Sequence, residues 1–124
     1  MEYKLPKQCL DKDIKVTRRP GRVRVHFAGQ IIADTVGALD LDEPGAPLRI
    51  YVPLADVEAG LLQASEHHTT CPYKGEASYY SLASGPETAK DAAWYYPDPC
   101  PLVAPIKGHV AFWGQQVRYE TITA

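Results

Sequence analysis

The stretch from Thr69 to Tyr80 concentrates side chains that could do chemistry. Cys71 provides a thiol, Lys74 an ammonium group three residues later, and Tyr79 a phenol. A thiol becomes a nucleophile only as the thiolate, which needs a nearby cation or the amino terminus of a helix. Lys74 could supply that charge, so Cys71 is a candidate nucleophile. A buried Cys that packs as a small apolar group is the more common arrangement.

Two histidines just before Cys71 offer further chemistry. Either of them could act as the base of a Cys/His pair, as could His26 or His109. Together with Cys71, His67 and His68 have ligand types that bind zinc. Structural zinc sites usually combine paired ligands, whereas this sequence has no C-x-x-C pair, and only Cys100 and His109 could complete four ligands. We therefore predict no metal site and no cofactor. The alternative role of the two histidines is to end a preceding helix, where a cation suits the negative pole.

Aromatic side chains are the stronger indication of a binding surface. Tyr and Trp cover a large area at low cost in conformational entropy, so they are common in pockets and interfaces. The aromatic rings, most of which carry a polar group, are too numerous to be explained by core packing alone, although the core remains the first expectation for Trp94. The rings are Tyr51, Tyr73, Tyr79, Tyr80, Trp94, Tyr95, Tyr96, Phe112 and Trp113.

These residues predict a small-molecule cleft. We expect its walls to be Cys71, Lys74, Tyr79, Trp94 and Tyr96, with Lys74 holding an anionic group and the rings covering an apolar or planar body. The alternative is a non-enzymatic interaction module in which exposed tyrosines form a homodimer or partner face. A thiol-dependent enzyme is the third hypothesis. The ligand and the reaction stay open, so an enzymatic activity is neither predicted nor excluded.

Alternation of apolar and polar residues predicts most of the elements that must position this cleft. In residues 22–27 the apolar side chains recur at every second position, which is the period of a half-buried strand. We predict strands over 14–18, 22–27, 31–35, 37–42, 48–52, 76–82, 89–96, 106–113 and 115–121. The expected fold is all-β, a single domain of two antiparallel sheets over residues 14–124, preceded by a loosely ordered arm over residues 1–13. The predicted core contains Val23, Val25, Phe27, Ile32, Leu39, Ile50, Val110 and Phe112.

One segment has the texture of a helix instead. Leu54, Val57, Leu61 and Leu62 recur at three- and four-residue spacing with polar residues between them. This spacing predicts one short amphipathic α-helix over residues 54–65.

Composition excludes several classes of function. The chain has 124 residues and a formal net charge of -2, which gives no general attraction to nucleic acid. No apolar run approaches the roughly 20 residues of a membrane helix, and the first residues have no apolar signal region. We therefore expect a cytoplasmic protein with reduced thiols at Cys9, Cys71 and Cys100. A Cys9–Cys100 disulfide is the alternative.

Several short motifs resemble one known family. They include Thr70-Cys71-Pro72-Tyr73-Lys74-Gly75 with Ala77 and Tyr79, then Ala93-Trp94 with Tyr96 and Pro99, and Gly108 with Val110-Ala111-Phe112. In these positions the sequence resembles the bacterial domain-of-unknown-function family 427, over about residues 14–120. The family carries a nucleotidyltransferase-like label, but the Gly-Ser pair and spaced Asp residues of that activity are missing here. The resemblance implies a β-tent-like fold, in which two antiparallel sheets meet at an angle. Relatives of that fold hold zinc through two Cys pairs or bind small ligands in an aromatic cage. Because the Cys pairs are missing, the resemblance implies a ligand site without a metal.

Overall fold

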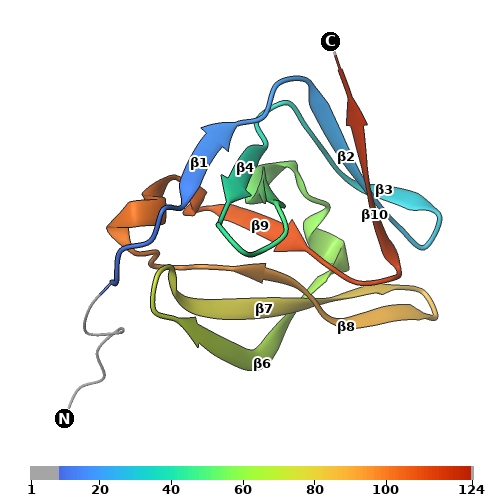
Figure 1. Cartoon of the computed structure of the whole chain (residues 1–124). Coiled ribbons are helices and arrows are strands. Elements are labelled where there is room, and N and C mark those ends of the chain that lie inside the picture. Colours follow the sequence, from blue (N-terminus) through green and yellow to red (C-terminus); the bar gives the residue numbers. More distant parts are fainter. Residues whose placement is uncertain (1–8, 124) are drawn as a thin grey trace.

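The computed structural model describes residues 9–123, which form two antiparallel β-sheets (Figure 1). The larger sheet has seven strands in the order β1-β4-β5-β9-β8-β7-β6, and the smaller has three in the order β10-β2-β3. The strands are β1 (Lys15–Arg18), β2 (Arg22–Phe27), β3 (Gln30–Thr35), β4 (Leu39–Asp42), β5 (Arg49–Pro53), β6 (Leu62–Cys71), β7 (Gly75–Ser84), β8 (Glu87–Tyr95), β9 (His109–Phe112) and β10 (Val117–Ile122). The predicted all-β class with two antiparallel sheets is therefore confirmed.

Three short 3-10 helices connect these strands. They are η1 (Leu54–Asp56), η2 (Ala59–Leu61) and η3 (Pro101–Ile106). Within residues 9–123, no helix is long and apolar enough to cross a membrane.

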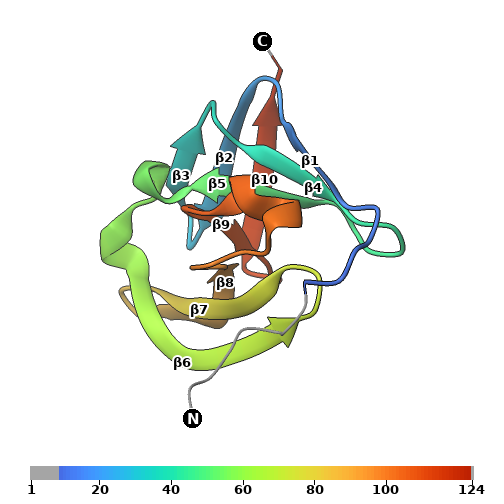
Figure 2. The same cartoon turned by 90° about the vertical axis from the view of Figure 1, so that its left-hand side faces the viewer.

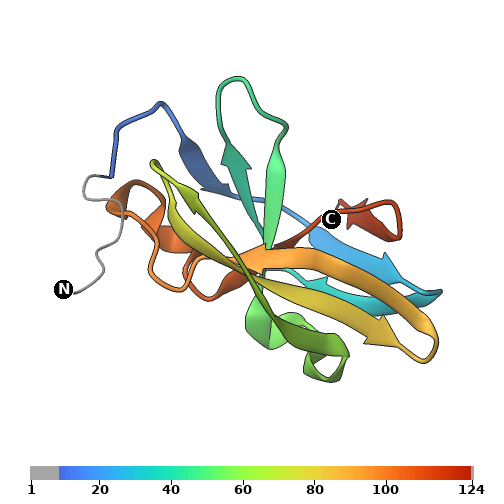
Figure 3. The ribbon, with the colours of Figure 1, turned by 90° about the horizontal axis from the view of Figure 1, so that it is seen from below.

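The main core lies between the two sheets. Alternate residues of β2 are buried, as its period-two pattern requires, and with Ile32 and Ala33 of β3 they meet apolar residues of β5, β8 and β9. The predicted core residues Val23, Val25, Phe27, Ile32, Val110 and Phe112 are all buried. Leu39 and Ile50 are only partly buried. At the far end, Gln30 Nε2 at the start of β3 donates to Ser84 Oγ at the end of β7 at 2.5 Å, and Figure 3 shows the two hairpins extending in the same direction.

The opposite face of the seven-stranded sheet has a second, smaller core. Helix η3 supplies Val103 and Ile106, and the chain before β1 supplies Ile14. These residues cover Leu41, Tyr51, Ala77, Tyr96 and Ala111. The covering elements are short, so part of this face stays accessible.

The predicted α-helix over residues 54–65 is wrong. Residues 54–61 form η1 and η2, and β6 begins at Leu62 and pairs with β7. Between the two turns, Val57 is extended and bridges Ala33 of β3, while Glu58 N–H donates to the Ile32 carbonyl at 2.8 Å. Val57 is buried, and Leu61 and Leu62 pack partly buried against the main core, whereas Leu54 is exposed, so the helix-like spacing does not mark one buried face. Pairing with distant strands then overrides the local pattern.

Two bulges bend the β6–β7–β8 part of the sheet. The β6–β7 register shifts between Ala64 and His68, and the β7–β8 register shifts between Tyr80 and Leu82. At the second bulge Asp91 has a φ of 51°, its N–H donates to Ser81 Oγ, and its carboxylate accepts from Ser65 Oγ at 2.5 Å. Bulges increase the twist of a strand. Figure 2 shows β6 strongly curved beneath the rest of the domain.

The expectation of three reduced thiols is wrong for two of them. Cys9 and Cys100 form a disulfide with their Cα atoms 5.7 Å apart, whereas Cys71 is free. The predicted loose arm over residues 1–13 falls partly outside the described residues. Its described part, residues 9–13, is held by this disulfide and by a hydrogen bond from Leu10 N–H to the Pro72 carbonyl.

Candidate functional site

A row of side chains crosses the face of the seven-stranded sheet that carries the second core. Tyr51 of β5 lies opposite Ala111 of β9, Ala111 lies opposite Trp94 of β8, and Trp94 lies opposite Tyr79 of β7. Residues directly opposite each other in a sheet point to the same face. The strand order therefore gathers three rings that are far apart in the sequence.

The small side chain of Ala111 lets the rings on either side of it interact. The Trp94 indole N–H donates to the Tyr51 hydroxyl at 3.0 Å, and the two rings meet edge to face. Tyr51 is buried, and this burial raises the pKa of its phenol to about 12 despite the indole hydrogen bond. Tyr51 therefore stays neutral at physiological pH and serves as a fixed acceptor that orients the indole.

A cavity of about 440 Å³ opens beside this row. Among the sequence-predicted site residues it brings together Lys74, Tyr79, Trp94 and Tyr96, whereas Cys71 is not part of its wall. Burial also raises the pKa of the Tyr96 phenol. The lining residues are Glu43, Ala46, Pro47, Arg49, Tyr51, Lys74, Tyr79, Asp91, Trp94, Tyr96 and Trp113.

The turn between β6 and β7 positions Lys74 in this wall. Lys74 N–H donates to the Cys71 carbonyl, and the Lys74 carbonyl accepts from Cys100 N–H. Gly75 has a φ of 116° and lies close to the Asp98 carbonyl, so a Cβ at this position would be strained and crowded. Cys71 therefore contributes to the site through its backbone, as the first residue of the turn.

The Lys74 ammonium is already paired. Its Nζ donates to Glu43 Oε1 at 2.6 Å, and Lys12 Nζ donates to Glu43 Oε2 at 2.8 Å. The side chains of Glu43 and Lys74 are only 13% and 14% exposed. Burial raises the pKa of Glu43, but the hydrogen bonds from the two lysines outweigh this effect, and the net pKa lies below the ordinary value. Glu43 is thus an ionised bridge between two cations.

Replacing this bridge in Glu43→Gln is expected to lower the free energy of unfolding at pH 7 by about 2 kcal/mol, because two partly buried ammonium groups lose their anion. The folded-state pKa of Glu43 is depressed, so its contribution is complete above the unfolded value near 4.5 and is lost as pH falls through the folded value. Urea unfolding between pH 7 and pH 3 should show that the variant loses less stability on acidification than the wild type.

Glu66→Gln is the matched control for this prediction, because Glu66 is exposed on β6 and forms no ion pair with the described residues. It should change stability by less than about 0.5 kcal/mol. If the free energy of unfolding falls equally steeply with pH in Glu43→Gln and in the wild type, Glu43 is not an ionised bridge.

The two histidines before Cys71 do not form a cluster with it. The His67 ring packs against Tyr79 with centroids 4.5 Å apart, while His68 Nδ1 lies 3.2 Å from Ser78 Oγ. Within residues 9–123, no group of three His, Cys, Asp or Glu side chains is arranged to hold a metal ion. Both histidines lie within β6, so they do not end a helix.

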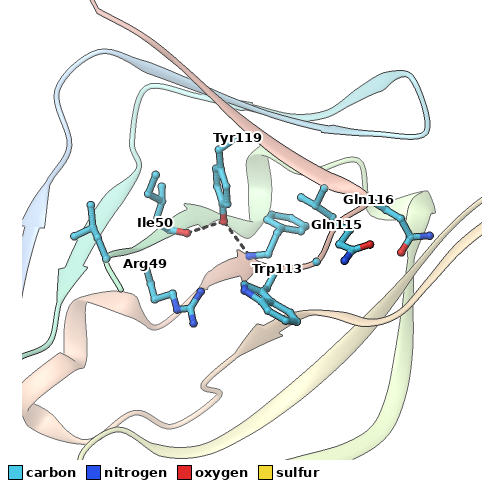
Figure 4. A pocket seen from close by; sticks show the side chains of 10 residues that line it. Arg49, Ile50, Trp113, Gln115, Gln116 and Tyr119 are labelled. Carbon is cyan, nitrogen blue, oxygen red and sulfur yellow. Dashed lines mark hydrogen bonds between the residues drawn. The ribbon is translucent and has the colours of Figure 1, made fainter. Parts of the chain in front are cut away.

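A second cavity, of about 690 Å³, adjoins the first (Figure 4). Arg49 and Trp113 line both cavities. On the far wall, the Tyr119 hydroxyl of β10 donates to the Ile50 carbonyl and accepts from Phe112 N–H. The remaining lining residues are Leu48, Gly114, Gln115, Gln116 and Val117.

Sequence reasoning missed several residues of the first cavity. Arg49 was treated only as part of a strand, although it shares the period-two face of Tyr51 in residues 48–52. Glu43 and Asp91 had no pattern to single them out, because their partners lie more than twenty residues away in the chain. The alternation of β5 was therefore the one usable signal.

These observations define a class, namely a small all-β domain whose larger sheet presents a ring-lined cavity. The chain matches the family described as Domain of unknown function (DUF427) over residues 15–123, and it belongs to that family. A comparison with curated proteins finds no match. The family expected from the short motifs is therefore confirmed.

Proposed function

We propose that this domain binds a small molecule in the cavity beside the Tyr51–Trp94–Tyr79 row. The proposal rests on the finding that residues chosen from the sequence lie around the same cavity. Lys74, Tyr79, Trp94 and Tyr96, proposed as ligand contacts from their chemistry alone, line one cavity although they come from separate segments. A volume of about 440 Å³ lies within the range of small-molecule sites.

Three side chains of the cavity wall are held in fixed positions, which supports a binding role over a purely structural one. The rings are held in place, since the Trp94 indole is bonded to Tyr51 and the Tyr79 hydroxyl lies 2.9 Å from Thr69 Oγ1. The Lys74 ammonium is fixed by Glu43. Pre-organised walls of this kind reduce the entropy lost on binding.

The test is a screen of a metabolite library on the full chain by ligand-observed NMR, repeated with Ala46→Trp. Ala46 is an exposed loop residue that lines the cavity, so an indole there would fill its entrance without disturbing the core. We expect compounds that bind the wild type to bind Ala46→Trp at least about tenfold more weakly, a change of about 1.4 kcal/mol.

Ala55→Trp is the matched control, because Ala55 is exposed in η1 and does not line the cavity. It should leave the affinities unchanged. Ligands that bind both variants as well as the wild type would place the binding site elsewhere and refute the proposal.

A homodimer or protein-interaction role is the second candidate function. Trp113 is 66% exposed and Leu48 is 47% exposed, and both lie at the rim of the second cavity. Large exposed apolar side chains that lie together favour an interface. Light scattering decides between the two states, and a dimer that dissociates in Trp113→Ser would support this candidate.

A further inference from the structure

Arg49 lies where the two cavities meet. It is the first residue of β5 and lines both cavities together with Trp113. Its guanidinium carbon is 5.4 Å from the centroid of the Trp94 ring, in cation–π contact. Figure 4 shows its side chain projecting beside that of Trp113.

Arg49 differs from the charged residues around it, because each of those has a bonding partner. Lys74 and Lys12 are both paired with Glu43, and Asp91 accepts a hydrogen bond from Ser65. The Arg49 side chain forms no ion pair and no hydrogen bond with the residues at positions 9–123, although its backbone belongs to the β4–β5 ladder. A guanidinium presents donors in a planar fork that matches a carboxylate, and the cation–π contact holds this fork beside the Trp94 indole.

The net charge of the surroundings favours an anion here. Arg49, Lys74, Glu43 and Asp91 line the cavity, and Lys12, which is outside the lining, is paired with Glu43, so this group contains three cations and two carboxylates. Lys74, the residue expected to hold an anion, is neutralised by Glu43 at 2.6 Å. Arg49 is therefore a better candidate than Lys74 to bind an anionic group.

We infer that the ligand is a planar organic carboxylate, with its carboxylate paired to Arg49 and its flat body packed among Trp94, Tyr79 and Tyr96. This inference rests on the proposed binding function and names the chemical class of the ligand. The rings supply π faces for a planar body. Arg49 supplies a pair of parallel hydrogen bonds to the anion.

The test compares matched acid and amide pairs on the full chain by isothermal titration calorimetry. Benzoate with benzamide and indole-3-carboxylate with indole-3-carboxamide differ in charge but hardly in shape. We expect each acid to bind at least about tenfold more tightly than its amide, since hydrogen bonds to charged groups are about twice as strong as neutral ones. In Arg49→Gln this preference should disappear, and Arg49→Lys, which keeps the charge without the fork, should recover part of it.

Arg118→Gln is the matched control, because Arg118 is exposed on β10 and lines neither cavity. It should keep the full preference for acids. Urea unfolding of each variant checks folding, and Arg49→Lys carries the test if Arg49→Gln does not fold.

The possible failures are distinguishable. Suppose that acids and amides bind with equal affinity, that Arg49→Gln leaves these affinities unchanged and that Ala46→Trp weakens them. This result would refute the inference that the ligand is a carboxylate, but it would support binding in the cavity. If neither the acids nor the amides bind, the inference of a carboxylate ligand is also refuted. The library screen with Ala46→Trp then decides separately whether the cavity binds anything.

Discussion

Cys9→Ser is expected to lower the free energy of unfolding by about 3 kcal/mol and Tm by about 12 °C, because it opens the disulfide to Cys100. The bridge joins residues separated by 91 positions. Closing a loop of that length removes conformational entropy from the unfolded chain worth roughly 4.5 kcal/mol in the chain-entropy model, an upper value that measured disulfides usually do not reach. Urea unfolding without reductant measures the change.

Substituting Cys9 rather than Cys100 separates the loss of the disulfide from other effects on stability. Cys9 is exposed, whereas Cys100 is 2% exposed, so a serine at position 100 would add the cost of burying a hydroxyl. With Cys9→Ser, the remaining Cys100 thiol packs as a small apolar group. Dithiothreitol should destabilise the wild type by a similar amount and leave Cys9→Ser unaffected.

Cys71→Ser is the matched control for the loss of a sulfur atom, because Cys71 is the free cysteine of the described chain. It should stay sensitive to reductant. If the wild type unfolds at the same urea concentration with and without dithiothreitol, the bridge contributes nothing to stability.

Local features of the fold could be predicted from the sequence, as the β2–β3 hairpin illustrates. Strand β2 alternates apolar and polar residues, β3 contains the apolar run Ile31-Ile32-Ala33, and the turn residues Ala28 and Gly29 both have positive φ, which Gly adopts freely. The strand pattern and the turn lie within fourteen residues, so nothing distant decides the outcome. The predicted ranges 22–27 and 31–35 accordingly match the structure closely.

Strand β6 could not be predicted in the same way. Most of its side chains are exposed on both faces, so it lacks the alternation that marks a half-buried strand. Its conformation comes from pairing with β7, across a register that shifts at Ala64 and His68. The apolar spacing of residues 54–62 is the stronger local signal, and it predicted a helix over residues 54–65.

The candidate site was predictable in its members but not in its geometry. Ring chemistry singled out Trp94, Tyr79 and Tyr96 without any knowledge of the sheet. The alignment of Trp94 and Tyr79 with Tyr51 depends on the order β5-β9-β8-β7, which places Ala111 between Tyr51 and Trp94. Sequence periodicity gives the face of each strand but not its neighbour, and for that reason Arg49 escaped notice.

Tyr119→Phe is expected to lower the free energy of unfolding by about 3 kcal/mol, since one buried hydroxyl joins the two sheets. From β10 of the smaller sheet, this hydroxyl donates to the Ile50 carbonyl at 2.9 Å and accepts from Phe112 N–H at 2.9 Å, both in the larger sheet (Figure 4). Phenylalanine keeps the ring but leaves two backbone groups without a partner. Each unsatisfied buried group costs about 1–3 kcal/mol.

Tyr79→Phe is the matched control, because it removes the same oxygen from a site where the hydroxyl meets only the exposed side chain of Thr69. It should change stability by less than about 1 kcal/mol. A second readout comes from alkaline pH. Burial raises the pKa of the Tyr119 phenol, so above about pH 10 the unfolded chain ionises first and stability falls. Tyr119→Phe should therefore lose less stability than the wild type between pH 9 and pH 11, whereas equal losses would mean that the phenol is not protected from ionisation by the fold.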